Sequence, residues 1–111
     1  TWDSFSRASV LLEEFVPFKQ ELAVMVARSA QGEIAVYPTV ETQQVDQICR
    51  RVFAPAKVSA EVASRMEGIA RTLVEALELV GIVGIECFLT QSDRILINEI
   101  APRTHNSGHY T

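Results

Sequence analysis

The sequence GIVGIECFLTQSDRILINEI, which begins at Gly81, contains two runs rich in β-branched and other apolar residues, Ile82–Thr90 and Arg94–Ile100. The polar stretch around Ser92-Asp93 separates these runs, which is the pattern of an antiparallel hairpin. A loop with an even number of residues, centred on this dipeptide, pairs residues at equal distances from its centre. The pattern therefore predicts both a hairpin and its register.

In this register Glu86 lies directly opposite Glu99. Like charges at opposed positions, with β carbons about 5 Å apart, repel each other, so a cation is expected between them. Mg²⁺, with Mn²⁺ as an alternative, takes oxygen ligands from one or two carboxylates, and the neighbouring Asn98 offers a neutral oxygen. Two other interpretations stay open: the glutamates share a proton, or a three-residue loop shifts the register and separates them.

The rest of the chain predicts strands followed by one long helix. Apolar residues recur at spacings of three and four from Val62 to Leu77, which indicates a helix with one buried face, with Ser59 as N-cap and Gly81 as its stop. Strands are predicted at Ser9–Val16, Glu21–Arg28, Glu33–Tyr37 and, less clearly within a polar stretch, Ile48–Phe53. The fold class is therefore α+β, an antiparallel sheet with one long packed helix, and not a doubly wound parallel sheet.

Composition excludes several classes of protein. Of the 111 residues 48% are hydrophobic and 22% are charged, which favours a folded domain over a disordered chain. No apolar run approaches the ~18 residues of a membrane span, and scattered basic residues with a net charge of −4 exclude a nucleic-acid partner. Cys49 and Cys87 lack metal or redox spacing and are expected to be free thiols in a cytoplasmic protein. Both ends are abrupt, so we expect an excerpt of a longer chain.

The segment APRTHNSGH, from Ala101 to His109, follows the second strand of the hairpin. Arg103 offers a planar fork for a carboxylate or phosphate, Asn106 and Ser107 offer neutral donors, and Gly108 allows close approach of a ligand to the backbone. A solvated loop is the alternative interpretation. Directly after a carboxylate pair, however, such a segment favours a site for an anion and a metal ion, as a nucleoside triphosphate would require.

The run INEIAPRTHNSGH, Ile97–His109, resembles the signature of the carboxyaminoimidazole ribonucleotide synthetases, which are ATP-grasp enzymes of purine biosynthesis. The similarity extends upstream in the family's order to the stretch EEFVPF, which begins at Glu13. The resemblance implies that residues 1–111 are the central and C-terminal portion of an ATP-grasp domain. It also implies that a glycine-rich loop, an upstream lysine and a downstream basic region lie outside this chain, so the isolated chain is expected not to turn over.

The resemblance implies a reaction in which ATP phosphorylates bicarbonate to carboxyphosphate, which then carboxylates aminoimidazole ribonucleotide. Glu86 and Glu99 match the family's metal ligands. Arg103, His105 and Asn106 match residues that line the bicarbonate pocket. The full-length enzyme is expected to be a homodimer, as is common in the family.

The resemblance also implies a nucleotide site. Its adenine-contacting strand matches Glu13, Glu14, Phe15 and Val16. Without the resemblance, these residues would be interpreted as an ordinary edge strand. Glu21 matches a ribose-binding acid, and Gln44 stands where many relatives have a histidine near the nucleotide. Asn98 and Glu99 complete the nucleotide-binding set. The alternatives are another ATP-grasp ligase, such as a formate-dependent glycinamide ribonucleotide transformylase, or a non-catalytic nucleotide- or metal-binding module.

Overall fold

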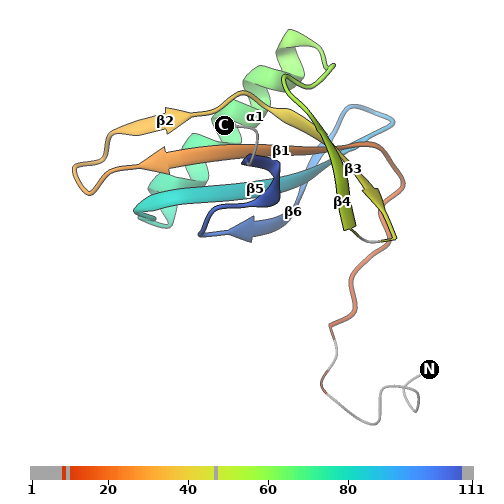
Figure 1. Ribbon diagram of the computed structural model, residues 1–111, viewed down its shortest axis with the longest axis horizontal. Helices are drawn as coiled ribbons and strands as arrows, with labels where there is room; N and C mark the ends of the chain where they lie inside the picture. Colours follow the sequence, from red (N-terminus) through yellow and green to blue (C-terminus); the bar gives the residue numbers. More distant parts are fainter. Residues whose placement is uncertain (1–8, 10, 47, 109–111) are drawn as a thin grey trace.

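The computed structural model describes residues 9, 11–46 and 48–108, apart from the side chain of Asn106. Within these residues, one antiparallel sheet is covered on one face by a single long helix (Figure 1). The strands have the spatial order β4-β3-β1-β5-β6, and β2 pairs with the C-terminal end of β1. The elements are β1 Phe18–Arg28, β2 Ile34–Val36, β3 Val40–Val45, β4 Ile48–Phe53, α1 Ala60–Ala76, β5 Gly81–Thr90, β6 Ile95–Ala101 and a short 3₁₀ turn, η2, at Asn106–Gly108.

The core lies between α1 and the two central strands, β1 and β5. Alternate residues of each strand point toward the helix, as the twofold periodicity of a strand requires. The helix contributes one face at spacings of three and four, which confirms the predicted periodicity. The core residues are Leu22, Val24 and Val26 of β1, Val62, Met66, Ala70 and Val74 of α1, and Val83, Ile85, Cys87 and Leu89 of β5. The opposite face of the sheet, here called the open face, carries the short η2 turn but no α-helix of the described residues (Figure 1).

The boundaries of α1 follow from its caps. The Ser59 hydroxyl accepts a hydrogen bond from the Val62 N–H (3.2 Å), which confirms the predicted N-cap. The helix ends at Ala76 with Leu77 as its C-cap, before Gly81, and the residue after the cap, Glu78, has a left-handed φ of 50°. The Glu78 N–H donates to Glu75 O and the Leu79 N–H donates to Val74 O, the two hydrogen bonds of a Schellman motif. The prediction that Gly81 stops the helix was therefore wrong.

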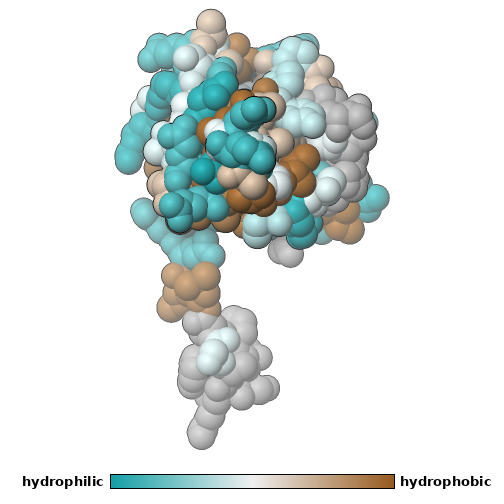
Figure 2. Space-filling model, turned by 90° about the vertical axis from the view of Figure 1, so that its left-hand side faces the viewer, coloured by the Kyte–Doolittle hydropathy of each residue, from teal (hydrophilic) through white to brown (hydrophobic). Residues whose placement is uncertain are grey.

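Two other predictions need correction. No regular strand forms over the described part of Ser9–Val16, and β1 begins only at Phe18. Leu11 and Leu12 are 81% and 89% exposed, so these two side chains pack neither against a strand of the described residues nor against the core (Figure 2). The other correction is β3, Val40–Val45, which was not predicted because its sequence VETQQV lacks a continuous apolar alternation. No helix of the described residues is long and apolar enough to cross a membrane.

Replacing Ser59 by Ala is expected to lower the free energy of unfolding by about 1 kcal/mol, because the Val62 N–H loses its side-chain acceptor. Urea denaturation followed by circular dichroism measures this change. Ser64→Ala, at an exposed position within the same helix, is the matched control and should leave stability nearly unchanged. An equal effect of the two substitutions would contradict a capping role for Ser59.

Candidate functional site

Glu86 and Glu99 lie directly opposite each other on β5 and β6, as predicted, but the hairpin reaches this register by another route. The Thr90 N–H donates to Arg94 O (2.9 Å), which closes a loop of the three residues 91–93. Asp93 takes a left-handed φ of 60°, as such a loop requires. The prediction of an even-numbered loop was therefore wrong, and on its own this loop would have displaced Glu99 by one position.

A β-bulge at Asn98 restores the pairing. Cys87 pairs with Ile97, Glu86 pairs with Glu99, and Asn98 is the extra residue between them. The bulge also explains why Ile97 and Glu99, although two positions apart, lie on opposite faces of the sheet: Ile97 is opposite the core residue Cys87, whereas Glu99 is opposite Glu86 on the open face. The loop and the bulge each shift the register by one residue, and the two shifts cancel.

The chain after β6 folds back over the open face and brings His105 to the glutamates. The His105 Nε2 atom lies 3.5 Å from Glu86 Oε1, and their side chains are only 10% and 16% exposed. Ligand atoms of Glu86, Glu99 and His105 all lie within 4.8 Å of one another. Side chains from β5, from β6 and from the segment after β6 thus form one compact cluster.

The electrostatics of this cluster favour a bound cation. Burial, followed by the hydrogen bond and negative charge of Glu99 and the charge of Glu21, raises the pKa of Glu86 from 4.5 to about 7. Burial also raises the pKa of Glu21. Without a cation, a proton between Glu86 and Glu99 relieves their repulsion near neutral pH. A divalent ion would take the place of that proton, and the two carboxylates with the Asn98 amide form the oxygen donor set that Mg²⁺ prefers.

One pocket on the open face is lined by Phe88 and by four of the predicted site residues. These four are Glu21, Gln44, Glu86 and Asn98. Phe88 also stacks on Phe18, with ring centroids 4.7 Å apart. The structure therefore brings the predicted ribose-binding acid and Gln44 next to the predicted metal ligands.

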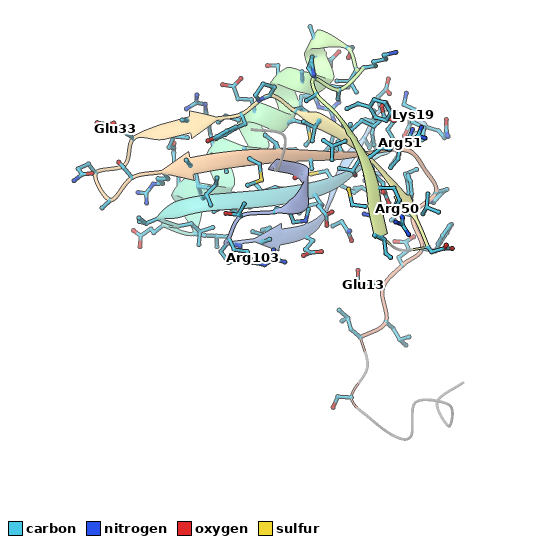
Figure 3. All side chains as sticks on the ribbon, in the orientation of Figure 1. Glu13, Lys19, Glu33, Arg50, Arg51 and Arg103 are labelled. Atoms are coloured by element: carbon cyan, nitrogen blue, oxygen red, sulfur yellow. The ribbon has the colours of Figure 1, made fainter. Side chains whose placement is uncertain are left out.

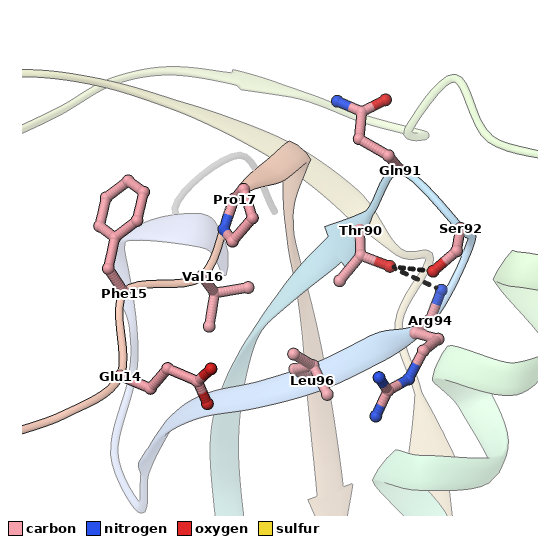
Figure 4. Close-up of a pocket in the computed structure, with 9 residues that line it drawn as sticks. All are labelled: Glu14, Phe15, Val16, Pro17, Thr90, Gln91, Ser92, Arg94 and Leu96. Atoms are coloured by element: carbon pink, nitrogen blue, oxygen red, sulfur yellow. Dashed lines mark hydrogen bonds between the residues drawn. The ribbon is translucent and has the colours of Figure 1, made fainter.

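A second pocket, of about 440 Å³, lies between the segment preceding β1 and the β5–β6 hairpin (Figure 4). Glu14, Phe15 and Val16 line one side of it, and Leu96 lies on the floor opposite them. The Thr90 hydroxyl accepts a hydrogen bond from the Arg94 N–H and shares another with the Ser92 hydroxyl, which holds the loop beside the pocket. The remaining lining residues are Pro17, Thr90, Gln91, Ser92 and Arg94. Leu96 is the cross-strand partner of Phe88, so the two pockets adjoin through one residue pair.

Three predicted residues belong neither to these pockets nor to the cluster of Glu86, Glu99 and His105. Glu13 is exposed and does not line the pocket that Glu14 helps to form. Arg103 is exposed near the end of β6, and its guanidinium donates to Thr104 O (3.0 Å) in its own loop (Figure 3). Asn106 lies in η2, and its side chain is outside the described part of the chain.

Sequence reasoning did not predict the contacts that hold His105 in place. A Cβ at Gly84 would lie 2.6 Å from His105 Cβ, so only glycine allows this close approach. On the other side, Ser107 Oγ lies 2.9 Å from His105 Nδ1 and 3.8 Å from Met25 Sδ. A glycine in the middle of a strand was the available signal for a close approach, whereas nothing in the sequence singled out Met25.

The chain is similar to known proteins in both sequence and fold. The sequence profile of the ATP-grasp domain matches residues 1–111. An N5-carboxyaminoimidazole ribonucleotide synthase from Synechococcus elongatus is 56% identical over 108 residues, which cover 97% of this chain and 27% of that protein. The ADP complex of an N5-carboxyaminoimidazole ribonucleotide synthetase superposes with a TM-score of 0.87 at 43% identity, covering 89% of this chain and 26% of that chain.

A third similar protein is the N5-carboxyaminoimidazole synthase of Aspergillus clavatus, solved with ADP and 5-aminoimidazole ribonucleotide. Its TM-score is 0.80 at 46% identity, over 88% of this chain and 26% of that chain. This chain therefore spans about a quarter of the length of these relatives. Because the profile matches from the first residue to the last, and the sheet and helix superpose on solved members, the chain belongs to the ATP-grasp family.

Proposed function

We propose that this chain is the part of a carboxyaminoimidazole ribonucleotide synthetase that holds the nucleotide phosphates and bicarbonate. The full-length enzyme would use ATP to convert bicarbonate to carboxyphosphate, releasing ADP, and then transfer the carboxyl group to the exocyclic amine of aminoimidazole ribonucleotide, releasing phosphate. The cluster of Glu86, Glu99 and His105 on the open face is the observation that carries the proposal. Relatives of this name, at 56% and 43% identity over most of the chain, support it.

In this proposal Glu86 and Glu99 hold Mg²⁺, or Mn²⁺, against the nucleotide phosphates, with Asn98 beside them. When bound, the ion supplies positive charge that offsets the charge on the transferred phosphoryl group. The chain's own contribution is to keep two carboxylates opposed at the bulge, with Glu86 largely shielded from water. Phosphoryl transfer asks a protein mainly for such positioning and charge neutralisation.

The larger pocket, together with the residues that surround the adjoining crevice of about 10 Å³, supports a nucleotide that runs along the open face. The backbone of the segment Glu13–Val16 would contact adenine in the larger pocket, above Leu96. Glu21 would bind the ribose hydroxyls, and Gln44 would lie near the nucleotide in the smaller pocket. The volume of about 440 Å³ lies within the roughly 300–1,000 Å³ typical of small-molecule sites.

His105, Arg103 and Asn106 would line the bicarbonate and carboxyphosphate pocket. The approach of His105 Nε2 to Glu86 (3.5 Å) supports this assignment for His105, and the sequence resemblance supports it for the other two. The resemblance also carries the proposals that the full-length enzyme is a cytoplasmic homodimer and that residues 1–111 form part of its ATP-grasp domain.

Release of ADP by the full-length enzyme tests the proposed function. With bicarbonate and ATP present, we expect aminoimidazole ribonucleotide to stimulate ADP release, and glycinamide ribonucleotide with formate to have no effect. Stimulation by the second pair of substrates alone would assign the chain to a formate-dependent transformylase instead. No stimulation by either would favour a nucleotide- or metal-binding module that does not catalyse a reaction.

A further inference from the structure

We propose that Ser107 is a positioning residue that holds His105 with its proton on Nε2, so that His105 acts in the site as a hydrogen-bond donor and not as a metal ligand. Ser107 lies in η2 and is fully buried. The assignment comes from the two nitrogens of the imidazole ring, each of which faces a group of a different kind.

The Nδ1 side of the ring faces donors. The backbone N–H of Ser107 donates to His105 Nδ1 (3.2 Å), and a backbone N–H can only donate. This nitrogen therefore presents its lone pair and carries no proton. The Ser107 hydroxyl lies 2.9 Å from Nδ1 and 3.8 Å from Met25 Sδ, and its single proton can be donated to only one of them, so the backbone N–H carries the assignment. In a neutral imidazole the proton then resides on Nε2.

The Nε2 side of the ring faces carboxylate oxygen. Glu86 Oε1 lies 3.5 Å from Nε2, an arrangement that suits an N–H on the nitrogen. A metal ligand would need an unprotonated Nε2, which requires the proton to move to Nδ1, against the Ser107 N–H. The compact cluster of Glu86, Glu99 and His105 is therefore a two-carboxylate metal site with an imidazole donor beside it, and not a three-ligand site.

Packing on the open face prevents the ring from moving to another arrangement. His105 is 8% exposed, and its β carbon lies over Gly84, where a Cβ would come within 2.6 Å. On the other side of η2, a Cβ at Gly108 would meet Met25 Cγ at 2.8 Å. Gly108 of η2 therefore packs against Met25, and His105 packs over Gly84, which fixes the Ser107 N–H relative to the ring.

The first test is ¹⁵N NMR of the chain with labelled histidine. The protonated and unprotonated imidazole nitrogens differ strongly in chemical shift, and a His105→Gln variant assigns the signals in a chain with two histidines. We expect His105 to show a proton on Nε2 both without metal and with saturating Mg²⁺. A proton on Nδ1, or its transfer to Nδ1 when Mg²⁺ is added, would overturn the proposal. This readout does not depend on the proposed function.

The second test compares Ser107 variants. Ser107→Ala keeps the backbone N–H and should keep the Nε2 proton, whereas Ser107→Pro removes the N–H and should produce a mixture of the two tautomers. Where the Pro variant fails to fold, the Ala variant and the wild-type metal titration still decide. The exposed Ser64→Ala is the control. An Nδ1 proton in the Ala variant would show that the backbone N–H does not set the tautomer.

The consequence for catalysis rests on the proposed function. In the full-length enzyme, Ser107→Pro should lower kcat by roughly tenfold, within the usual range for a residue that orients a site from behind, with the KM for ATP unchanged. An unchanged kcat together with a mixture of tautomers in this variant would retain the tautomer assignment and overturn its role in the reaction. Absence of bicarbonate-dependent ADP release in the wild type would instead overturn the proposed function and leave the NMR result standing.

Discussion

Replacing either Glu86 or Glu99 by Gln is expected to lower ADP release by the full-length enzyme by roughly 10³-fold, about 4 kcal/mol of transition-state stabilisation. The two side chains face each other on neighbouring strands, and an amide at either position removes half of the charge that would hold Mg²⁺. The substitution keeps the size of the side chain, so the fold should persist. Steady-state kinetics measures the first effect, and circular dichroism checks the second.

Stability distinguishes a catalytic pair from a purely structural one. The pKa of Glu86 is raised from 4.5 to about 7, so the folded state binds more protons than the unfolded state between these values. This contribution to stability is fully present below pH 4.5 and is lost as the pH rises through about 7. At pH 8 without metal, Glu86→Gln should therefore raise the free energy of unfolding by on the order of 2–3 kcal/mol, and the gain should shrink toward pH 5.

Added Mg²⁺ should reverse this order. The ion binds the folded wild type and raises its melting temperature, while Glu86→Gln should respond only weakly. Thermal unfolding at pH 8, with and without Mg²⁺, measures both effects. A Glu86→Gln variant that is less stable than the wild type without metal would contradict the idea that this carboxylate is kept buried at a cost in stability. Full activity in either variant would contradict the metal site.

The hairpin shows how much of the site could be predicted from the sequence. The alternation of apolar residues fixes which residues of β5 face the helix, and this alone places Glu86 on the open face. The opposition of Glu86 and Glu99 was predicted correctly from an incorrect loop. Loop length and bulge are each decided by local backbone geometry, at Asp93 and Asn98, that the pattern of apolar residues does not encode.

Other parts of the site depend on contacts between distant segments. His105 reaches Glu86 because η2 packs on Met25 of β1, a residue more than eighty positions earlier in the chain. The tautomer of His105 depends on one backbone N–H, which every non-proline residue possesses and which no sequence motif identifies. The segment before β1 was predicted as a strand because its side chains are apolar, yet a strand also needs a partner for its backbone groups. The sequence thus predicted the opposition of the two carboxylates but not the loop, the bulge and the packing that hold the site together.

Gly84→Ala is expected to displace His105 from the glutamates. The new methyl group would lie 2.6 Å from His105 Cβ and 3.2 Å from Met25 Sδ, and the first of these contacts is with an atom attached directly to the backbone. The loop must move away from the sheet, which should cost about 1–3 kcal/mol of stability. A shift of about 1 Å at a catalytic group can lower turnover roughly 10²-fold, so kcat should fall by about that factor in the full-length enzyme.

Gly68→Ala is the matched control for this prediction, because the same methyl group is added where nothing lies within 4 Å. Gly68 is an exposed position inside α1, so alanine there should raise the free energy of unfolding by about 0.5–1 kcal/mol and leave kcat unchanged. Urea denaturation and ADP release of both variants measure the contrast. If Gly84→Ala retained wild-type kcat, His105 would not need its place over Gly84, and its role beside the carboxylate pair would have to be abandoned.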